Sequence, residues 1–569
     1  MAGAPRFQPP VNKSRTQRVR RNRRLLWAAA VAVVLLLAAA GGLAYAESRE
    51  RAREARWRCP GLDRLATDEY ALSRPGGRFG GQCLGWTVTR DHAFGSTNPA
   101  IQAVISRIVG ANRAVRDQAA GPEGKPYVRV GLLMPMTWEP GGAMGEGEIL
   151  HALQGAAVAQ HEANRPRTKI RDGVPLVQLV LANEGVDQTG WKALDPGEVG
   201  PDDQRDWPGV VAQLAPLARD RERPLVAVTG MGISVPATRE AAAALAGHGI
   251  PSIGSVVTAN DMTAPSFFKI SPSNRQYVDS LAAWVAEARL KGARLERAML
   301  VFDRSADDSY VRTLRESFLE VFDGQYALSD HQRGFTGSKL PVTGATAPQG
   351  TPRLFASVVD DICASEPDIV FYSGRSRDLA PFVEALGERG RCQARIKPLL
   401  IATGATGLTV TDADADKARV GIIDAASTDH ARWRTQAPGT PRAYREFTAA
   451  FTGPTPGGLG FPATDLNDGY AVMHRDAVVA AVWAARLWLE DKSGSPGDGG
   501  AGGSAQPTAA DVRNALFSLG TRPLPGGSGD LHFVEDEKQG LWPRSKPVPI
   551  VTIGDLANRL PRGAVYLTN

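Results

Sequence analysis

Residues 224–263 read PLVAVTGMGISVPATREAAAALAGHGIPSIGSVVTANDMT, and this segment gives the clearest indication of the fold. Its first apolar run, 225–229, has the length and the β-branched content of a buried strand. A glycine-containing turn follows, and then an alanine-rich segment, 236–248, with the composition of a helix. A second short apolar run, 251–254, ends the unit. Strand, helix and strand in this order predict a βαβ unit with parallel strands.

The same alternation continues on both sides of this unit. The chain has 569 residues, of which 43% are hydrophobic, so it is long enough for several such units. Further strands are expected at 128–134, 176–182, 297–302, 325–329, 368–372 and 397–402, and further helices at 149–164, 208–220, 275–291, 309–322, 354–364 and 378–388. Parallel sheets with right-handed crossovers make this a doubly wound α/β fold.

An apolar segment without charge lies near the N-terminus, from Leu25 to Ala46. At about 1.5 Å per residue it would reach roughly 33 Å as a helix, which is enough to cross a bilayer core. Residues 1–24 are basic and contain no acid, which predicts a cytoplasmic tail and an exported body. A cleaved signal peptide is the alternative, because Ala44-Tyr45-Ala46 fits a cleavage signal. The length of the apolar segment favours a single-pass cell-membrane protein with its C-terminal part outside the cytoplasm.

The remaining composition excludes several functions. The formal net charge of +6 comes from the tail, so nothing indicates nucleic-acid binding by the body. The chain contains no phosphate-binding P-loop and no G-x-S-x-G elbow, and Val235 stands where a dinucleotide fingerprint beginning at Gly230 needs its third glycine. His151 and His161 lack the spacing of a metal-ligand pair. We therefore expect a binding protein without catalytic residues, metal or cofactor, rather than an enzyme.

Four cysteines, Cys59, Cys83, Cys363 and Cys392, fit an exported chain, in which an even number predicts disulfides. Three pairings are possible, and proximity in the sequence favours Cys59–Cys83 and Cys363–Cys392. None of the four has a C-x-x-C neighbour, which argues against a metal site.

Several segments resemble those of type I periplasmic solute-binding proteins, in particular the branched-chain amino-acid-binding components of ABC transporters. The first strand and loop, VRVGLLMPMT (128–137), the helix ILHALQGAAVAQHEAN (149–164) and the stretch 224–263 resemble the first lobe of that family. Similar segments are FFKISP (267–272), RAMLVFDRSADDSYVRTLRESF (297–318), PDIVFYSGRSRDLAPFVEALGERG (367–390), 461–487, 528–533 and 547–553. The resemblance implies two doubly wound lobes joined by hinge crossings, a small solute between them and an ABC permease as partner.

Composition and resemblance together predict the domain organisation. The expected parts are a basic tail (1–24), a transmembrane helix (25–46), a juxtamembrane segment with Cys59 and Cys83 (47–126), the first part of lobe 1 (127–272), lobe 2 (273–425), the return to lobe 1 with a flexible insertion at 493–506 (426–525) and a closing segment (526–569).

The resemblance also implies ligand-binding residues in lobe 1. Ser234, in the loop after Gly230, and Thr258 correspond to hydroxyl residues that bind the ligand in that family. Thr137, in the loop after the first strand, is a further candidate. Hydroxyls add hydrogen-bond donors without charge. The alternative for Ser234 and Thr258 is that they cap helices.

Lobe 2 departs from the family pattern. Asp307 and Asp308 stand where a tyrosine is common, and Arg375 stands where another is common. The usual acidic partner for a ligand ammonium is not evident in 402–406. Asp307 or Asp308 would replace that acid or form a solvated loop, and Arg375 would favour a ligand with an extra anion.

The function expected is capture of a small polar, amino-acid-like solute for an ABC importer. A ligand-sensing ectodomain or a degenerate scaffold without transport is the alternative. Ser234→Ala or Thr258→Ala is expected to weaken binding, and Arg312→Ala is expected to leave it unchanged.

Overall fold

The computed structural model describes most of the chain, which divides into two compact units, Met1–Arg58 and Cys59–Asn569. The residues described are 27, 30–33, 35–36, 39–40, 42–45, 47–48, 51 and 54–569 apart from 76, 123, 140–141, 166–173, 195–206, 306, 338–353, 390–398, 405–407, 409, 494–505 and 537–539. The basic tail 1–24, much of the apolar segment 25–46 and nearly all of the insertion 493–506 therefore lie outside the described residues. Within the described part of the chain, no helix has both the length and the apolar character needed to span a membrane.

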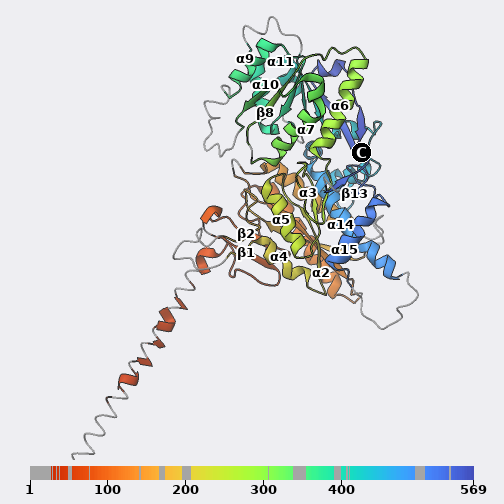
Figure 1. Cartoon of the computed structure of the whole chain (residues 1–569). Coiled ribbons are helices and arrows are strands. Elements are labelled where there is room, and N and C mark those ends of the chain that lie inside the picture. Colours follow the sequence, from red (N-terminus) through yellow and green to blue (C-terminus); the bar gives the residue numbers. More distant parts are fainter. Residues whose placement is uncertain are drawn as a thin grey trace, which may run out of the picture. The chain divides into compact units, whose positions relative to one another are not determined.

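Lobe 1 is built on a sheet that has nine strands among the described residues, in the order β1-β2-β4-β3-β5-β6-β7-β14-β13. Figure 1 labels β1, β2 and β13 of this sheet. The strands are β1 (Tyr70–Ser73), β2 (Leu84–Thr87), β3 (Tyr127–Met134), β4 (Leu176–Asn183), β5 (Leu225–Gly230), β6 (Ser252–Gly254), β7 (Phe267–Lys269), β13 (Phe533–Asp536) and β14 (Gly540–Pro543). The central strands from β4 to β7 pair in parallel. Every residue of β3 and β4 is buried, because helices cover both faces of the sheet.

The helices of lobe 1 come from both ends of the chain. They are α2 (Pro99–Ala120), α3 (Glu146–Ala163), α4 (Val210–Ala218), α5 (Pro236–Gly247), α12 (His430–Trp433), α13 (Tyr444–Thr452), α14 (Tyr470–Ser493) and α15 (Ala509–Phe517). Helices α3 and α14 pack so closely that a Cβ added to Gly155 would lie 1.9 Å from the carbonyl oxygen of Ala471. This backbone contact joins two segments that lie far apart in the sequence.

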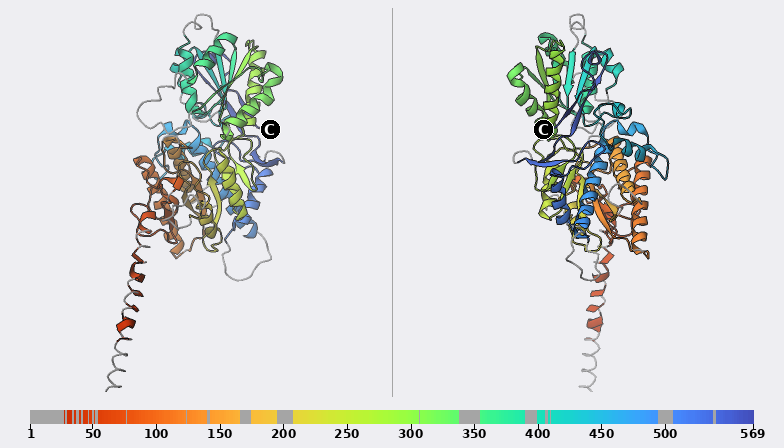
Figure 2. Two further views of the ribbon diagram at one scale, coloured as in Figure 1. Left: turned by 60° about the vertical axis from the view of Figure 1, so that its left-hand side comes forward. Right: turned by 90° about the vertical axis from the view of Figure 1, so that its right-hand side faces the viewer.

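Lobe 2 has a smaller sheet in the order β16-β15-β12-β11-β10-β8-β9. Figure 2 shows this lobe mainly in green and teal. Its strands are β8 (Ala298–Asp303), β9 (Gln332–Phe335), β10 (Ile369–Ser373), β11 (Leu399–Thr403), β12 (Val420–Ala425), β15 (Pro547–Ile553) and β16 (Val565–Leu567), and its helices are α6 (Asn274–Leu290), α7 (Ser309–Tyr326), α9 (Ala356–Ser365), α10 (Ser376–Gly387) and α11 (Asp412–Lys417). The strands from β9 to β12 pair in parallel. The chain passes between the lobes after β7, after β12 and between β14 and β15, so residues 526–569 contribute to both lobes. The predicted fold class, two α/β lobes with mainly parallel sheets, is confirmed.

The strand expected at 325–329 is wrong. Helix α7 continues to Tyr326 and ends at Ala327 in a left-handed conformation, and strand β9 begins only at Gln332. Phe322 and Tyr326 extend the buried face of the helix, and both rings pack against Phe371. Spacing by four residues places such side chains on one helix face.

Residues 59–120 belong to lobe 1, which corrects the expectation of a separate juxtamembrane segment at 47–126. Strand β2 pairs antiparallel with β4, and the apolar face of α2, including Ile101 and Ile105, is buried in the lobe 1 core. The segment thereby covers an edge of the parallel sheet that would otherwise be open. The structure contains the predicted Cys59–Cys83 disulfide. Cys363 is also disulfide-bonded, and Cys392, its predicted partner, lies outside the described residues.

Candidate functional site

A cavity of about 280 Å³ lies between the two lobes. Lobe 1 contributes the loops after β3, β5 and β6 and the first turns of α3 and α14. Lobe 2 contributes the first turns of α6, α7 and α10. The cavity therefore lies beyond the carboxyl ends of parallel strands, where helix N-termini and loop side chains are available to a ligand.

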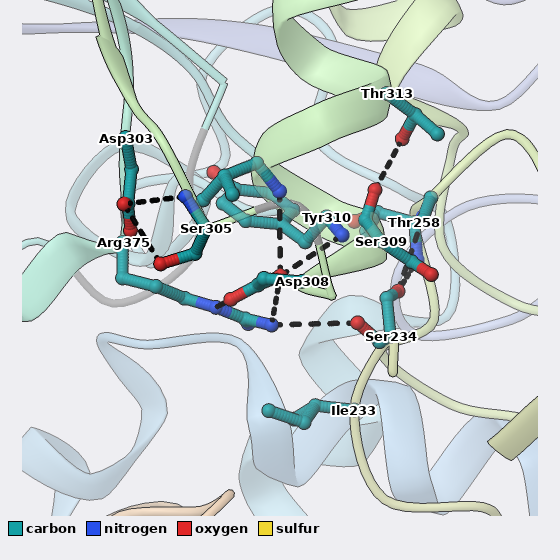
Figure 3. Close-up of polar contacts among 12 residues, drawn as sticks. Ile233, Ser234, Thr258, Asp303, Ser305, Asp308, Ser309, Tyr310, Thr313 and Arg375 are labelled. Atoms are coloured by element: carbon teal, nitrogen blue, oxygen red, sulfur yellow. Dashed lines mark hydrogen bonds and ion pairs between the residues drawn. The ribbon is translucent and has the colours of Figure 1, made fainter. Parts of the chain in front are cut away.

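Ser234 and Thr258 lie side by side in the lobe 1 wall (Figure 3). The Ser234 Oγ accepts hydrogen bonds from the backbone N–H of Thr258 (2.8 Å) and of Ala259 (3.1 Å). Neither side chain caps a helix, because Val235 is the N-cap of α5 and Ser273 is the N-cap of α6. The Ser234 hydroxyl proton has no acceptor among the described residues, so it is available to a ligand.

Arg375 and Asp308 form an ion pair at the lobe 2 wall, with side chains 16% and 19% exposed (Figure 3). Arg375 Nε donates to Asp308 Oδ2 and Arg375 Nη2 to Asp308 Oδ1, each at 2.8 Å. The guanidinium also lies 4.8 Å from the ring centroid of Tyr310, and Nη2 is 3.4 Å from the carbonyl oxygen of Ser234 in the other lobe. Burial lowers the pKa of Arg375, but Asp308 outweighs that effect and raises it, so the guanidinium stays charged.

Asp308 therefore pairs with Arg375 and is not available to a ligand ammonium. One of our expectations was that Asp307 or Asp308 would be the acidic partner of that ammonium. The Oδ1 of Asp308 also accepts from the backbone N–H of Tyr310 (3.0 Å), as the N-cap of α7. Asp307 is exposed and does not line the cavity. Tyr310, in the first turn of α7, lines the cavity, and its hydroxyl donates to the carbonyl oxygen of Gly404 (2.6 Å).

Thr137 lies away from this cavity. It lines a second cavity of about 370 Å³ that is formed with residues 60–97, and its buried Oγ1 has no hydrogen-bond partner among the described residues. The loop after β3 instead contributes Trp138, which borders both cavities.

Glu148 is a cavity residue that the sequence reasoning missed. It is the third residue of α3, and its Oε2 accepts from the backbone N–H of Gly145 at 2.8 Å, as in a capping box. Burial raises the pKa of Glu148 most and Asp468 adds to the rise, while the Gly145 N–H, Arg375 and a hydrogen bond from Tyr470 oppose it. The signal in the sequence is the spacing Gly145-x-x-Glu148 before an apolar helix, which marks a helix start but not a ligand.

Tyr277, Tyr310 and Tyr470 line the cavity together with Trp138, so its walls are rich in aromatic rings. Aromatic side chains supply apolar surface with a polar tip, which suits a ligand that has an apolar part. Tyr277 and Tyr470 each lie in the first turn of a helix, α6 and α14, whose packing fixes their positions.

The charged groups that line the cavity are Glu148, Arg375 and Arg377, as far as the described residues go. Arg377 is exposed and has no partner among those residues. Asp308 neutralises the charge of Arg375. The Glu148 carboxylate and the Arg377 guanidinium therefore remain in the cavity without an ion-pair partner among the described residues. This balance fits a zwitterionic ligand.

Metal binding has little support in the part of the chain that the structure describes. The one cluster of suitable ligand atoms there is Cys59, Cys83 and His92. Its two sulfur atoms are joined in the disulfide and cannot act as thiolate ligands.

Neither a family model nor a curated protein sequence matches this chain. Its structure is similar to those of branched-chain amino acid ABC transporter substrate-binding proteins. The protein LivJ of Streptococcus pneumoniae, in complex with isoleucine, is 15% identical, with a TM-score of 0.47 over 78% of this chain and 99% of that one. The leucine-binding protein LivK of Thermotoga maritima is 14% identical, with a TM-score of 0.47 over 78% and 98%. A substrate-binding protein of Desulfitobacterium hafniense in complex with Leu is 17% identical, with a TM-score of 0.45 over 78% and 99%.

Proposed function

We propose that this chain is a solute-binding protein that captures a small zwitterionic, amino-acid-like ligand between its two lobes. The observation that carries the proposal is the cavity of about 280 Å³ with walls from both lobes. Its volume is close to the lower end of the range of small-molecule sites, roughly 300 Å³, which suits a ligand of amino-acid size.

The charges of the walls support a ligand with one ammonium and one carboxylate group. Glu148 would accept from the ammonium, and Arg377, with the uncapped first turn of α10 at Ser376, would donate to the carboxylate. The hydroxyls of Ser234 and Thr258 would add donors on the opposite wall. Aromatic residues would contact the remaining apolar part of the ligand.

An ABC permease would receive the ligand, and the segment Leu25–Ala46 would hold the protein at the outer face of the cell membrane. A basic tail before that segment and disulfides after it support this placement, since disulfides persist in oxidising compartments. Closure of the lobes around the ligand would create the surface that the permease reads.

A thermal-unfolding screen of the purified chain against amino acids, amides and small carboxylates tests the proposal. A ligand at 100 times its Kd should add about 2.7 kcal/mol of stability. Ser234→Ala and Thr258→Ala should each weaken binding of that ligand by about tenfold, because each removes a hydrogen bond worth about 1.4 kcal/mol. No stabilisation by any compound would contradict the proposal.

The control for these variants is Arg294→Ala, since Arg294 is exposed and has no partner among the described residues. The Arg312→Ala control named above is unsuitable. Arg312, in lobe 2, pairs at 2.6 Å with Asp261 in the loop between β6 and β7 of lobe 1, so its removal would disturb the contact between the lobes.

Glu148→Gln should weaken binding of an amino acid by about tenfold or more near neutral pH, because it removes a charge-assisted contact with the ammonium. The folded-state pKa of Glu148 is raised above 4.5, so the charge is present above that raised pKa and is lost as the pH falls through it. Wild-type affinity should therefore fall on acidification, and the variant should lose this pH dependence. Calorimetric titrations at several pH values measure both effects.

Glu146→Gln is the matched control, because Glu146 lies in the same helical turn but lines the second cavity. Glutamine at position 148 retains the capping geometry, so α3 should still form. Equal affinity and equal pH dependence of the wild type and Glu148→Gln would exclude Glu148 as the ammonium partner.

A further inference from the structure

The pairing of Arg375 uses most of its directed donors within the protein. Nε and Nη2 both point at the Asp308 carboxylate, in the side-by-side geometry with which a guanidinium binds any carboxylate. The N-cap role of Asp308 needs only its Oδ1, whereas Oδ2 serves Arg375 alone. The pair therefore does more than start helix α7.

The position of this pair matters because Arg375 lines the cavity. Figure 3 shows the pair beside Ser234. A ligand carboxylate that approached Arg375 would meet a guanidinium whose Nε and Nη2 donors already bind the Asp308 carboxylate. Of the described contacts, the Nη2 bond to the Ser234 carbonyl oxygen adds a third constraint from the other lobe. Nη1 alone has no hydrogen-bond partner among the described residues, and because its two N–H bonds diverge from a single nitrogen, it cannot reproduce the side-by-side two-point contact.

We infer that Asp308 determines the charge selectivity of the cavity by occupying Arg375 in place of a ligand carboxylate, so that the cavity accepts zwitterions with uncharged side chains and rejects ligands with a second carboxylate. The inference rests on the proposed function for the choice of ligand class. The geometry of the ion pair does not depend on that choice. It differs from the expectation that Arg375 favours a ligand with an extra anion.

Asp308→Asn tests the inference, because asparagine is as good an N-cap as aspartate but carries no charge. The variant leaves a buried guanidinium without its counter-ion, so its Tm should fall by several degrees. Succinate, compared with sodium chloride at equal ionic strength, should restore at least half of that loss and bind at least about tenfold more tightly than to the wild type. In the same variant, the affinity for L-glutamate relative to that for L-glutamine should rise by a similar factor.

Three further variants of the full chain make the result specific. Asp308→Ser, which also caps a helix but is too short to reach Arg375, should repeat the gain if the asparagine variant folds poorly. The double variant that combines Asp308→Asn with Arg375→Gln should lose the gain in affinity for succinate. Asp555→Asn, which removes one exposed carboxylate that has no side-chain partner among the described residues, should behave as the wild type.

The outcomes separate this inference from the proposed function. If the wild type binds an amino acid but neither Asp308 variant gains affinity for succinate, the inference is wrong and the proposed function stands. If the variants gain affinity through Arg375 while no amino acid binds the wild type, the proposed function fails and the role of Asp308 stands. Tight binding of succinate by the wild type, or a gain that persists without Arg375, would overturn the inference.

Discussion

Replacement of Gly155 by alanine is expected to destabilise the protein by about 3 kcal/mol or more, although alanine normally stabilises a helix interior. A Cβ at this position would lie 1.9 Å from the carbonyl oxygen of Ala471, 2.7 Å from its carbonyl carbon and 2.9 Å from its Cα. These are backbone atoms of a neighbouring helix, which cannot move aside as a flexible side chain can. Helices α3 and α14 would have to separate, with loss of packing along the centre of lobe 1.

The same contact positions two residues of the cavity. Glu148 lies on α3 two turns before Gly155, and Tyr470 immediately precedes Ala471 on α14. Separation of the helices would move both side chains, so Gly155→Ala should weaken ligand binding as well as stability. Denaturant unfolding and calorimetric titration measure the two effects.

Gly110→Ala is the matched control. Gly110 lies in the middle of α2, where an added Cβ meets nothing within 4 Å. The change should stabilise the protein by roughly 0.5–1 kcal/mol. If the two alanine variants had similar stability, the close approach of α3 and α14 would be refuted.

Lys269→Met is expected to stabilise the protein by roughly 3 to 5 kcal/mol at pH 6, the second large effect. Lys269 is fully buried on β7, and its Nζ has no hydrogen-bond partner among the described residues. The rings of Phe267 and Trp542, each 4.8 Å from Nζ, offset part of the cost of the buried charge. Burial nevertheless lowers the pKa of Lys269 from 10.5 to about 7.

The direction of the pH dependence follows from that shift. The unfolded chain binds the Lys269 proton more tightly than the folded protein does, so the penalty is complete below about pH 7. It is relieved as the pH rises from about 7 to 10.5, and the contribution of Lys269 to wild-type stability should improve across that window. Lys269→Met should lose this dependence. Denaturant unfolding at pH 6 and pH 9 measures it.

Lys546→Met is the control, because Lys546 is a buried lysine with partners. Its Nζ donates to Ser528 Oγ at 2.6 Å, and Asp476 raises its pKa against the larger lowering effect of burial. Removal of this group should destabilise the protein, since it leaves polar partners behind. A destabilised Lys269→Met variant would show that the buried amine is paired.

Local pattern determined the fold class of this protein, whereas the resemblance to type I periplasmic solute-binding proteins pointed to its cavity residues Ser234, Thr258 and Arg375. In residues 128–402 the spacing of apolar residues reflects which side chains each strand or helix buries. This spacing can be recognised without knowing which other elements pack against that strand or helix. Ser234 and Thr258 follow such strands directly, and parallel strands bring their carboxyl ends to one edge. The short strands β1 and β2, of four residues each, carry too little periodicity for the same reasoning.

The charge of the cavity depends on contacts between residues that lie far apart in the sequence. Asp308 and Arg375 are 67 residues apart, and Glu148 meets Tyr470 only because α3 and α14 pack backbone to backbone at Gly155. The resemblance made Asp307, Asp308 and Arg375 candidates for ligand binding, but it could not show that Asp308 and Arg375 neutralise each other. Pairing depends on distances of a few ångströms, which are set by the packing of whole elements and leave no periodic trace in the chain.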